Sequence, residues 1–316
     1  MSTPRILVIG QSGQLAWELR RVLISLGQLY WTARVPESTP CALRLDLSDH
    51  DAIRTTIRDL RPKLIVNAAA YTDVERAEQE TESARRINVD APRVLAEEAA
   101  REGAVLVHFS TDYVFDGKGE RPYRETDPAS PLNAYGRSKL DGEDAVRAAL
   151  DAHLIVRSSW LYAPRGRNFL RTMLNLGRAR DRVSVVDDQY GNPTSARALA
   201  AATVALLKRV GFDARDRLMR HAGTYHLAAT GRCSWCAFAK RIYALSSLGA
   251  DAPEVEAISS ARFAARATRP ACSALDCGKA RALGVVLPHW SESLATTMAE
   301  IAAQARSHEG AHGGSN

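Results

Sequence analysis

The chain has 316 residues, of which 46% are hydrophobic and 25% are charged, a composition typical of a globular protein rather than a disordered or fibrous one. The formal net charge of +6 is a small excess that suits anionic small molecules, and no basic run alternates with aromatic residues as on a nucleic-acid-binding surface. No signal peptide is predicted, and no apolar run approaches the roughly 20 residues of a membrane span. We therefore expect a cytoplasmic protein that binds neither nucleic acid nor membrane.

Short apolar runs alternate with segments of helical periodicity through the first half of the chain. The first run, 5–9, is unbroken and rich in β-branched residues, as expected of a strand that is buried on both faces. The expected strands are 5–9, 29–33, 42–45, 64–67, 105–110 and 153–158, and the expected helices are 15–26, 49–60 with Ser48 as its cap, 73–80, 88–101 and 134–150. This alternation predicts an α/β fold with a Rossmann-like, doubly wound parallel sheet.

The second half alternates less regularly and predicts a smaller, interleaved substrate-binding lobe. The expected elements are helices 168–178, 196–210, 234–248 and 292–305, strands 183–186 and 224–227, and a loop over 264–274. We assign 1–165 mainly to the Rossmann domain and 166–306 mainly to the lobe, with segments that return to the first domain. The Gly-, His- and Ser-rich stretch 307–316 is expected to be a disordered tail.

The five cysteines include one Cys-x-x-Cys pair, Cys233 and Cys236. An odd number of cysteines in a chain of this size indicates reduced thiols. No second pair follows with zinc-site spacing, and the pair begins an apolar run with helical periodicity. We therefore expect both thiols to pack at the start of a helix rather than to act in redox or zinc chemistry.

A glycine-rich turn, Gly10-x-x-Gly13-x-x-Ala16, follows the first strand and opens the first helix. Glycines in this setting let the backbone approach a pyrophosphate, which then lies on the N–H groups of the helix. The second strand ends in Arg34 without an acidic residue, and an arginine there accommodates a 2′-phosphate. Asp46 follows the third strand, where a carboxylate can accept a hydrogen bond from an adenine amino group. The motif predicts a dinucleotide site.

Tyr135 and Lys139 are four residues apart on a predicted helix, so both side chains lie on one face. A neighbouring cation lowers the pKa of a phenol, which predicts that Tyr135 is a proton donor or acceptor near neutral pH. Thr111 ends a predicted strand and can bond the same substrate oxygen. His108 is expected to be a packed or hydrogen-bonded residue, and the histidines form no metal set. Ser158 has no nucleophile-elbow context, which argues against a serine hydrolase.

Together these motifs resemble the extended short-chain dehydrogenase/reductase superfamily and, within it, the family of dTDP-4-dehydrorhamnose reductases. The resemblance extends from Ile6 to about Trp290. The matching segments are 10–15, 66–72, 107–115, 130–139, 157–162, 188–194 and 268–273.

The resemblance implies a role for each matched residue. Tyr135 corresponds to the proton donor, Lys139 to the lysine that binds the nicotinamide ribose and tunes the tyrosine, and Thr111 to the threonine of the triad. Residues expected to contact the sugar nucleotide are Thr111, Asp112, Trp160 and Arg269, the last in a loop that closes on the diphosphate. Residues expected to contact NADPH or NADH are Gly10, Ser12, Gly13, Gln14, Leu15, Arg34, Asp46, Leu47, Ala70, Tyr71, Thr72, Phe109, Tyr135 and Lys139.

The implied activity is reduction of the C4 keto group of dTDP-6-deoxy-L-lyxo-4-hexulose, a dTDP-4-keto sugar, to dTDP-L-rhamnose. One alternative is a 4-epimerase or 4,6-dehydratase of the same superfamily, although Tyr113 after Asp112 departs from the Asp-Glu pair of related dehydratases. Another alternative is a non-catalytic regulatory subunit of the methionine adenosyltransferase type. Retention of Thr111, Tyr135 and Lys139 favours catalysis.

Two departures from the family pattern are visible. Ala16 replaces the third glycine of the fingerprint, and a residue this small still permits close packing of helix on strand. Some relatives hold Mg²⁺ at a dimer interface through a first-helix glutamate and acids on a later helix. Glu18 is present here, but the later helix begins Ser195-Ala-Arg197. No metal site is therefore expected, and a homodimer stays possible.

Overall fold

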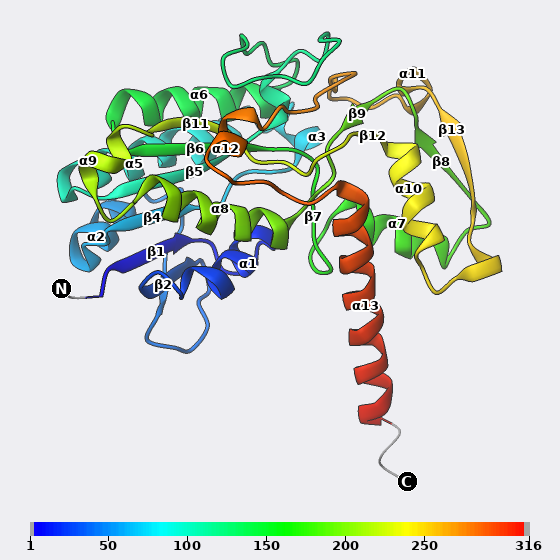
Figure 1. Ribbon diagram of the computed structural model, residues 1–316, viewed down its shortest axis with the longest axis horizontal. Helices are drawn as coiled ribbons and strands as arrows, with labels where there is room; N and C mark the ends of the chain where they lie inside the picture. Colours follow the sequence, from blue (N-terminus) through cyan, green and yellow to red (C-terminus); the bar gives the residue numbers. More distant parts are fainter. Residues whose placement is uncertain (1–2, 313–316) are drawn as a thin grey trace.

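The computed structural model describes residues 3–312, and a seven-stranded parallel sheet lies at the centre of its larger part (Figure 1). The strand order is β11-β6-β5-β4-β1-β2-β3, and every neighbouring pair is parallel. The predicted Rossmann-like, doubly wound sheet is confirmed. Its strands are β1 (Arg5–Ile9), β2 (Gln28–Ala33), β3 (Ala42–Arg44), β4 (Leu64–Asn67), β5 (Val105–Thr111), β6 (His153–Ser158) and β11 (Gly223–His226).

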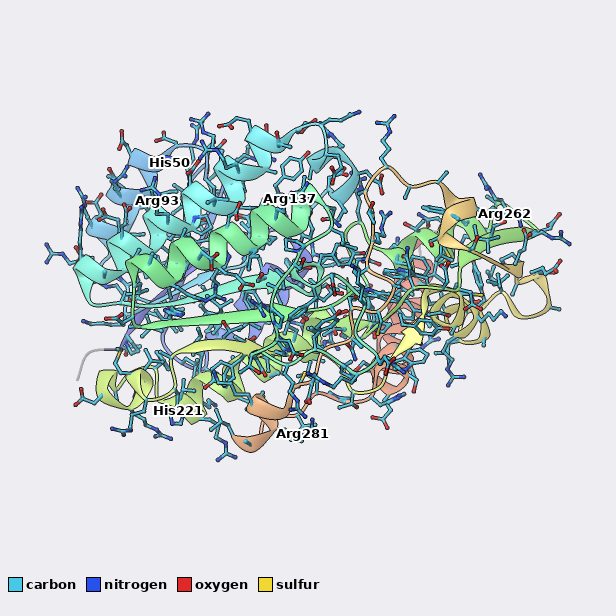
Figure 2. The ribbon with its side chains drawn as sticks, turned by 90° about the horizontal axis from the view of Figure 1, so that it is seen from above. His50, Arg93, Arg137, His221, Arg262 and Arg281 are labelled. Carbon is cyan, nitrogen blue, oxygen red and sulfur yellow. The ribbon has the colours of Figure 1, made fainter. Side chains whose placement is uncertain are left out.

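Helices cover both faces of the sheet. On one face α2 (His50–Leu60), α5 (Ala91–Glu102) and α6 (Ala134–Ala149) pack side by side, and on the other α1 (Gln14–Leu23) packs against α8 (Ala196–Val210). Figure 2 shows Arg93 and Arg137 on the first side, and His221 and Arg281 on the opposite side. Since parallel strands are buried on both faces, the apolar runs of the sequence become its core.

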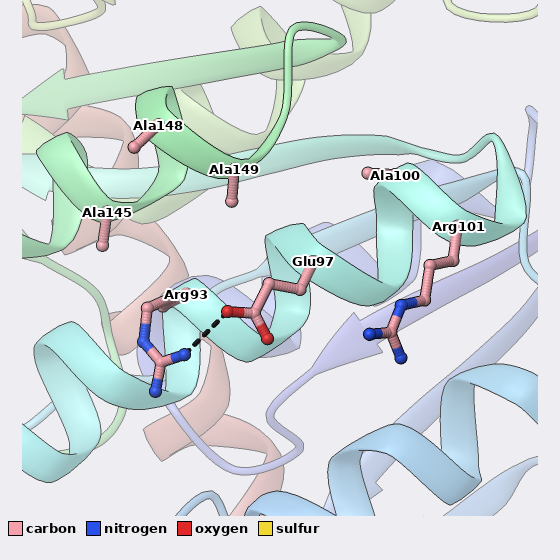
Figure 3. Close-up of a pocket in the computed structure, with 7 residues that line it drawn as sticks. All are labelled: Arg93, Glu97, Ala100, Arg101, Ala145, Ala148 and Ala149. Atoms are coloured by element: carbon pink, nitrogen blue, oxygen red, sulfur yellow. Dashed lines mark hydrogen bonds and ion pairs between the residues drawn. The ribbon is translucent and has the colours of Figure 1, made fainter.

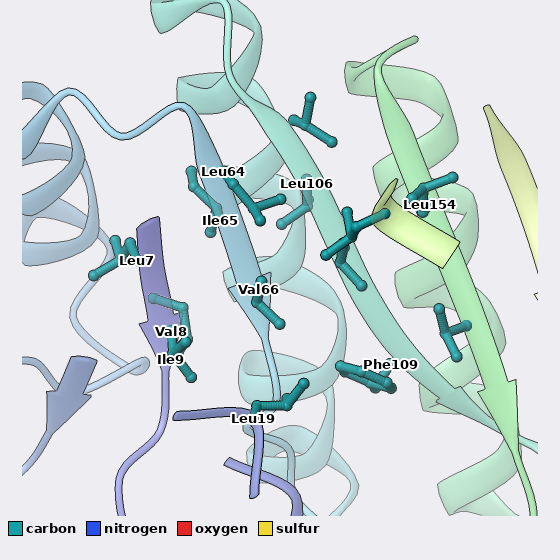
Figure 4. Close-up of a cluster of buried hydrophobic side chains, with 14 of the residues drawn as sticks. Leu7, Val8, Ile9, Leu19, Leu64, Ile65, Val66, Leu106, Phe109 and Leu154 are labelled. Atoms are coloured by element: carbon teal, nitrogen blue, oxygen red, sulfur yellow. The ribbon is translucent and has the colours of Figure 1, made fainter. Parts of the chain in front are cut away.

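The core between sheet and helices is built from these central strands (Figure 4). Leu7, Ile65, Leu106 and Leu154, one from each of four adjacent strands, are all 0% exposed. The strands run in one direction, so their carboxyl ends share one edge of the sheet. Ligands of open α/β sheets bind at this edge.

The smaller part of the molecule has its own sheet and core. β8 (Arg182–Val186) pairs in parallel with β13 (Glu254–Ile258), and α7 (Phe169–Gly177) packs on α10 (Trp235–Ala244). Strand β13 was not expected from the sequence. Two small pairings, β7 (Leu161–Tyr162) with β10 (Thr194–Ser195) and β9 (Tyr190–Gly191) with β12 (Cys233–Ser234), join this lobe to the larger part. The remaining short helices are α9 (Arg215–Met219), α11 (Ser260–Phe263), α12 (Gly278–Ala282) and a 3₁₀ turn, Gly249–Asp251.

The C-terminal helix α13 (Trp290–His312) packs its first turns on the lobe and then extends away from the body (Figure 1). It is longer than the predicted 292–305 and includes 307–312 of the predicted tail. Residues 313–316 of that tail lie outside the described residues. Within residues 3–312, no helix combines the length and the apolar character that a membrane span requires.

Two local predictions were wrong. Helix α2 is capped by Asp49, whose carboxylate accepts from the Ala52 N–H at 3.0 Å, because Ser48 instead donates to Asp46. The expected helix 73–80 is only the short α3 (Val74–Ala77), and it is followed by α4 (Thr81–Arg85). The expected helix 88–101 is confirmed as α5, preceded by a π-helical turn (Arg86–Asp90) that includes its first residues.

The π-helical turn positions a buried asparagine that connects two other segments. It carries Asn88, which is 1% exposed and exchanges hydrogen bonds with the backbone of Tyr71 at 2.9 and 3.1 Å. The same amide donates to Ser138 of α6 at 2.9 Å. The widened turn thus ties the loop after β4 to the helix that carries Tyr135 and Lys139.

Candidate active site

The glycine-rich turn has the backbone geometry that a dinucleotide requires. Gly10 has a φ of +119°, and a Cβ there would lie 3.1 Å from the Cβ of buried Ala16. Helix α1 begins after Gly13 without a side-chain cap and without an acidic residue in its first turn. Its first N–H groups therefore point to an open edge, which suits a pyrophosphate. Ser12 is exposed beside them, and the residues present fit the predicted cofactor.

Gln14 and Leu15 lie in the first turn of α1. Leu15 is buried, whereas Gln14 accepts from Asn168 Nδ2 at 2.7 Å and donates to the Arg167 carbonyl at 3.2 Å. The start of α1 is thereby connected to the loop that precedes α7 in the lobe. No local sequence pattern indicates this connection, because the two segments are about 150 residues apart.

The adenosine end of the predicted cofactor site contains more charge than the motif suggested. Arg34 is exposed after β2, and Asp46 is held by the backbone N–H of Ser48, which lowers the pKa of its carboxyl group, with the Arg34 charge acting in the same direction. Sequence reasoning missed Arg20. Its guanidinium lies 3.9 Å from the centroid of the Trp31 ring and forms a 3.0 Å ion pair with Glu37.

The other expected cofactor residues lie along the same edge. Ala70, Tyr71 and Thr72 form the loop after β4, whereas Leu47 and Phe109 are buried in the core. The Tyr71 hydroxyl donates to Glu80 at 2.7 Å.

The predicted triad comes from two adjacent elements. Thr111 ends β5, and α6 begins at once after Asn133, whose side chain accepts from the Gly136 N–H at 2.7 Å. A Cβ on Gly136 would lie 2.2 Å from the Tyr113 carbonyl, so the helix approaches the 3₁₀ turn Asp112–Val114 closely. This approach brings Tyr135 close to Thr111. Burial has the largest effect on the tyrosine pKa, and the nearby Thr111 hydroxyl acts against it.

The expectation of a lowered tyrosine pKa was wrong. Burial raises the pKa of Tyr135 to about 12, and the Asp112 charge adds to the increase. Lys139 does not offset this increase, since it is 2% exposed and donates to the Phe109 carbonyl at 2.7 Å, with His108 Nε2 at 3.3 Å. The cation is held by those groups, and burial lowers its own pKa to about 8. His108 is fully buried and hydrogen-bonded, as predicted.

Asp112 lies at the junction of three segments. Its carboxylate is 2% exposed and accepts hydrogen bonds from Thr111, from Ser159 at 3.0 Å, and from Ser273. Burial raises its pKa to about 6. Asp112 thus joins the ends of β5 and β6 to the loop after α11, a structural connection that the sequence did not indicate.

Trp160 lies where the lobe meets the sheet and has a φ of +47°. Its indole stacks on Trp235 with 3.4 Å between ring centroids, and a Cβ on Gly191 would lie 2.4 Å from the same indole. The backbone strain at Trp160 is therefore maintained by packing on both sides. The sequence pattern identifies Trp235 only as part of an apolar helix, since its stacking depends on contacts distant in sequence.

Arg269 belongs to a loop that crosses the carboxyl edge of the sheet. It forms a 2.6 Å ion pair with Glu75 of α3, which also accepts from the backbone N–H groups of Arg266 and Ala267. The loop is held further by Asn133, whose Nδ2 donates to the Thr268 carbonyl at 2.8 Å. The structure thus brings Arg269 to the same edge as the triad. Glu75 was missed.

Glu18, considered above as a candidate metal ligand, faces an arginine. Arg197 lies between Glu18 and Glu300 at 3.7 and 2.7 Å. Among residues 3–312, no group of three or more His, Cys, Asp or Glu side chains has an arrangement that could hold a metal ion. Cys233 and Cys236 are buried in the lobe core at the start of α10, as predicted, and burial raises the pKa of both thiols.

A cavity of about 510 Å³ lies away from this edge, between α5 and α6 (Figure 3). It is lined by Arg93, Glu97, Ala100 and Arg101 of α5 and by Ala145, Ala148 and Ala149 of α6. The α6 residues are at the opposite end of the helix from Tyr135, so the cavity is not part of the candidate site.

Comparison with known proteins first gives the fold. A UDP-glucose 4-epimerase from Thermus thermophilus in complex with NAD shares the fold, with a TM-score of 0.77 and 18% identity, and the match covers 94% of this chain and 98% of that one. This likeness shows the fold: an open, doubly wound α/β sheet of the kind that binds ligands at the carboxyl edge of its strands.

The family follows from closer matches. The chain belongs to the RmlD substrate binding domain family, which matches residues 4–303. It is 39% identical to dTDP-4-dehydrorhamnose reductase of Salmonella typhimurium and 38% identical to that of Escherichia coli K12, with 94% of this chain and 97% of each relative covered. A crystal structure of dTDP-4-dehydrorhamnose reductase from Bacillus anthracis in complex with NADP has a TM-score of 0.82 and 34% identity, covering 95% of this chain and 100% of that one.

Proposed function

We propose that the protein reduces the C4 keto group of dTDP-6-deoxy-L-lyxo-4-hexulose with NADPH or NADH and forms dTDP-L-rhamnose, the final step of dTDP-rhamnose biosynthesis. The observation that carries the proposal is the juxtaposition of Thr111, Tyr135 and Lys139 at the same sheet edge as the open Gly10–Gly13 turn. Support comes from relatives of that name that match almost the whole chain.

The hydride comes from the bound nicotinamide dinucleotide. Tyr135 donates its phenol proton to the oxygen at C4 as negative charge develops there. Its pKa of about 12 keeps the phenol protonated at neutral pH, so it is ready to act as the acid. Thr111, beside it, offers a hydroxyl to the same oxygen and helps to hold the carbonyl in line.

We propose that Trp160 and Arg269 bind the sugar nucleotide and that Glu75 controls access to Arg269. Trp160 presents an indole fixed by Trp235, and an aromatic face of this kind packs well on a sugar or base ring. Arg269 offers a planar set of donors to the diphosphate. In the structure described, that guanidinium is held by Glu75, so substrate phosphates compete with a carboxylate for it.

The test is turnover of the dTDP-4-keto sugar by the purified protein with NADPH. We expect stoichiometric oxidation of the cofactor and formation of dTDP-L-rhamnose, with Tyr135→Phe as the matched inactive control. A C4-epimerised product without net cofactor consumption, together with NAD that copurifies, identifies an epimerase instead. No turnover of any 4-keto sugar favours a regulatory subunit.

We further propose a cytoplasmic location, in keeping with five free cysteines. A homodimer is a proposal of the same standing. Sedimentation velocity of the purified protein decides whether one forms.

A further inference from the structure

Three buried polar side chains form a chain of contacts behind the proposed catalytic edge. His108 on β5 is 0% exposed, and its Nδ1 lies 3.1 Å from Nδ2 of Asn67 on β4. Its Nε2 lies 3.3 Å from Nζ of Lys139, which also donates to the Phe109 carbonyl at 2.7 Å. Asn67 and Lys139 are 1% and 2% exposed. All three side chains are removed from water, so each of their polar hydrogens must find its acceptor among these neighbouring groups.

A neutral imidazole carries a single N–H, so two arrangements of hydrogens have to be compared for these contacts. In the first, Asn67 Nδ2 donates to His108 Nδ1 while Asn67 Oδ1 accepts from the Ala69 N–H at 3.3 Å. The imidazole proton is then on Nε2 and points at Lys139. That contact is a hydrogen bond only when the lysine is a neutral amine with a free lone pair.

In the second arrangement Lys139 is an ammonium and donates to His108 Nε2. The imidazole proton is then on Nδ1, and Asn67 must rotate its amide to present Oδ1 to it, which gives up the bond from the Ala69 N–H. A neutral Lys139 can donate or accept at Nε2, but only the first arrangement keeps the Ala69 bond, so loss of the lysine proton favours the Nε2–H tautomer of His108.

We propose that His108 is a positioning residue that links the proton on Lys139 to the amide orientation of Asn67 through a change of imidazole tautomer. In the ammonium state two of the three lysine hydrogens are held by His108 and the Phe109 carbonyl. The third is left to face outward, toward the expected nicotinamide ribose. His108 thus fixes both the position and the charge state of the lysine that the proposed function assigns to catalysis, and the kinetic part of this inference rests on that function.

The charged groups around these three side chains agree with this role. Burial lowers the pKa of His108 well below its ordinary value, and the charges of Lys139 and Arg147 act in the same direction, so the imidazole stays neutral. Burial lowers the pKa of Lys139 to about 8, against an opposing effect of Glu143 one turn along α6. Glu143 is itself paired with Arg157 of β6 at 2.7 Å. Of the three side chains, Lys139 is therefore the one whose pKa lies near neutral pH.

The direct test observes the His108 tautomer in the wild-type protein by long-range proton–nitrogen correlation spectra, from about pH 6 to about pH 10. The His108 signals are assigned in the wild type itself, by through-bond correlation of the ring with the His108 backbone. We expect the Nδ1–H tautomer at low pH and the Nε2–H tautomer at high pH, with a midpoint near the lysine pKa of about 8. A single tautomer over the whole range, or an imidazolium signal, overturns the proposal. No substrate is used, so the result is independent of the proposed function.

A pair of substitutions then tests the kinetic consequence. A glutamine oxygen approximates the Nε2 position, so His108→Gln keeps an acceptor for Lys139. His108→Asn approximates Nδ1 and loses that acceptor. Loss of a hydrogen bond to a buried ammonium lowers its pKa, so we expect the basic limb of kcat/KM to move down by about one pH unit or more in His108→Asn and to stay in place in His108→Gln.

The matched control is His226, another 0% exposed histidine, which lies on the edge strand β11 with its Nδ1 3.0 Å from the Tyr123 carbonyl. His226→Asn is expected to leave the basic limb where it is. Equal limbs in His108→Asn and His108→Gln show that the imidazole does not act through Lys139 and overturn the proposal. If neither variant folds, the wild-type tautomer measurement still decides. Absence of turnover in the wild type contradicts the proposed function and leaves the tautomer result unaffected.

Discussion

Arg197 and Glu300 form a 2.7 Å ion pair that joins helix α8 to the C-terminal helix α13. The same guanidinium lies 3.7 Å from Glu18 of α1, a carboxylate that is only 4% exposed and that also faces Arg21. One arginine thus supplies positive charge to two carboxylates from different helices. A buried carboxylate requires a partner of opposite charge. Here that partner is an arginine of the same protein and not a bound cation.

Chelation is expected to leave the protein unchanged. Arg197 stands between carboxylates where a divalent cation would otherwise be needed, and its charge would repel Mg²⁺. We expect equal kcat and equal sedimentation coefficients before and after treatment with EDTA. Loss of either property, restored by added Mg²⁺, would show that Glu18 finds other acidic partners. Arg197→Gln serves as the control and should lower the Tm, because Glu18 then keeps only Arg21.

Tyr135→Phe is expected to abolish turnover while the fold and cofactor binding are kept. The substitution removes only the phenol hydroxyl, and general acid catalysis contributes about 10²–10⁴-fold to rates. The measurements are kcat, the dissociation constant of NADPH and the Tm. A kcat within a few-fold of the wild-type value would contradict the assignment of Tyr135 as the general acid.

Lys139→Met is expected to reduce both kcat and cofactor affinity. The ammonium donates to the Phe109 carbonyl and is assigned to the nicotinamide ribose, so the variant loses a buried anchor as well as a cofactor contact. Tyr135→Phe is the comparison, since it should affect kcat alone. A variant with weaker turnover but unchanged cofactor affinity would separate Lys139 from the ribose.

The parts of the fold that sequence predicted well depend on local pattern. Strands such as Leu64–Asn67 read as short apolar runs because parallel strands are buried on both faces, and their order along the chain then implies the sheet. Strand Glu254–Ile258 escaped prediction, since it is largely exposed and has two glutamates in five residues. It becomes a strand by pairing with Arg182–Val186, about 70 residues earlier.

The same division applies to the candidate site. Motif spacing brought Tyr135 and Lys139 to one helix, but their protonation depends on burial and on the His108 and Phe109 groups of a neighbouring strand. Glu75 and Trp235 were missed for a similar reason. Each acts on a predicted residue, Arg269 or Trp160, across a large sequence separation that no local pattern records.

Asp112 gives a prediction for stability against pH. Burial raises its folded-state pKa from 3.8 to about 6, so the folded protein binds this proton more tightly than the unfolded chain. The stabilising contribution is present below the unfolded pKa and is lost as pH rises through the folded pKa. A shift of about two units predicts that the free energy of unfolding of the wild type, relative to Asp112→Asn, falls by about 2 kcal/mol between about pH 4.5 and about pH 7.5.

Urea unfolding of both proteins at several pH values measures that difference. The amide introduced by Asp112→Asn cannot ionise, so any pH dependence common to the two proteins cancels. A constant difference over this range would mean that the carboxylate is already stabilised as an anion by the hydroxyls of Ser159 and Ser273.

Two guanidinium groups, those of Arg34 and Arg20, can determine the choice between NADPH and NADH. Arg34 is exposed after β2 and forms no ion pair with any described residue, although its charge acts on the Asp46 carboxylate, whereas Arg20 is stacked on Trp31 and already paired with Glu37. A planar guanidinium donates well to a 2′-phosphate, and the group without a carboxylate partner is the more available. We therefore expect NADPH to be preferred about tenfold, equivalent to about 1.4 kcal/mol, with Arg34 as its main source.

The measurement is kcat/KM for NADPH and NADH at saturating sugar nucleotide in the wild type, Arg34→Ala and Arg20→Ala. Arg34→Ala should remove most of the preference by weakening NADPH alone. Glu37→Gln is the matched control for the second guanidinium, because it frees Arg20 and should raise the preference for NADPH if that side chain reaches the ribose. A wild-type preference for NADH, or a ratio unchanged by Arg34→Ala and abolished by Arg20→Ala, would transfer the role from the strand end to helix α1.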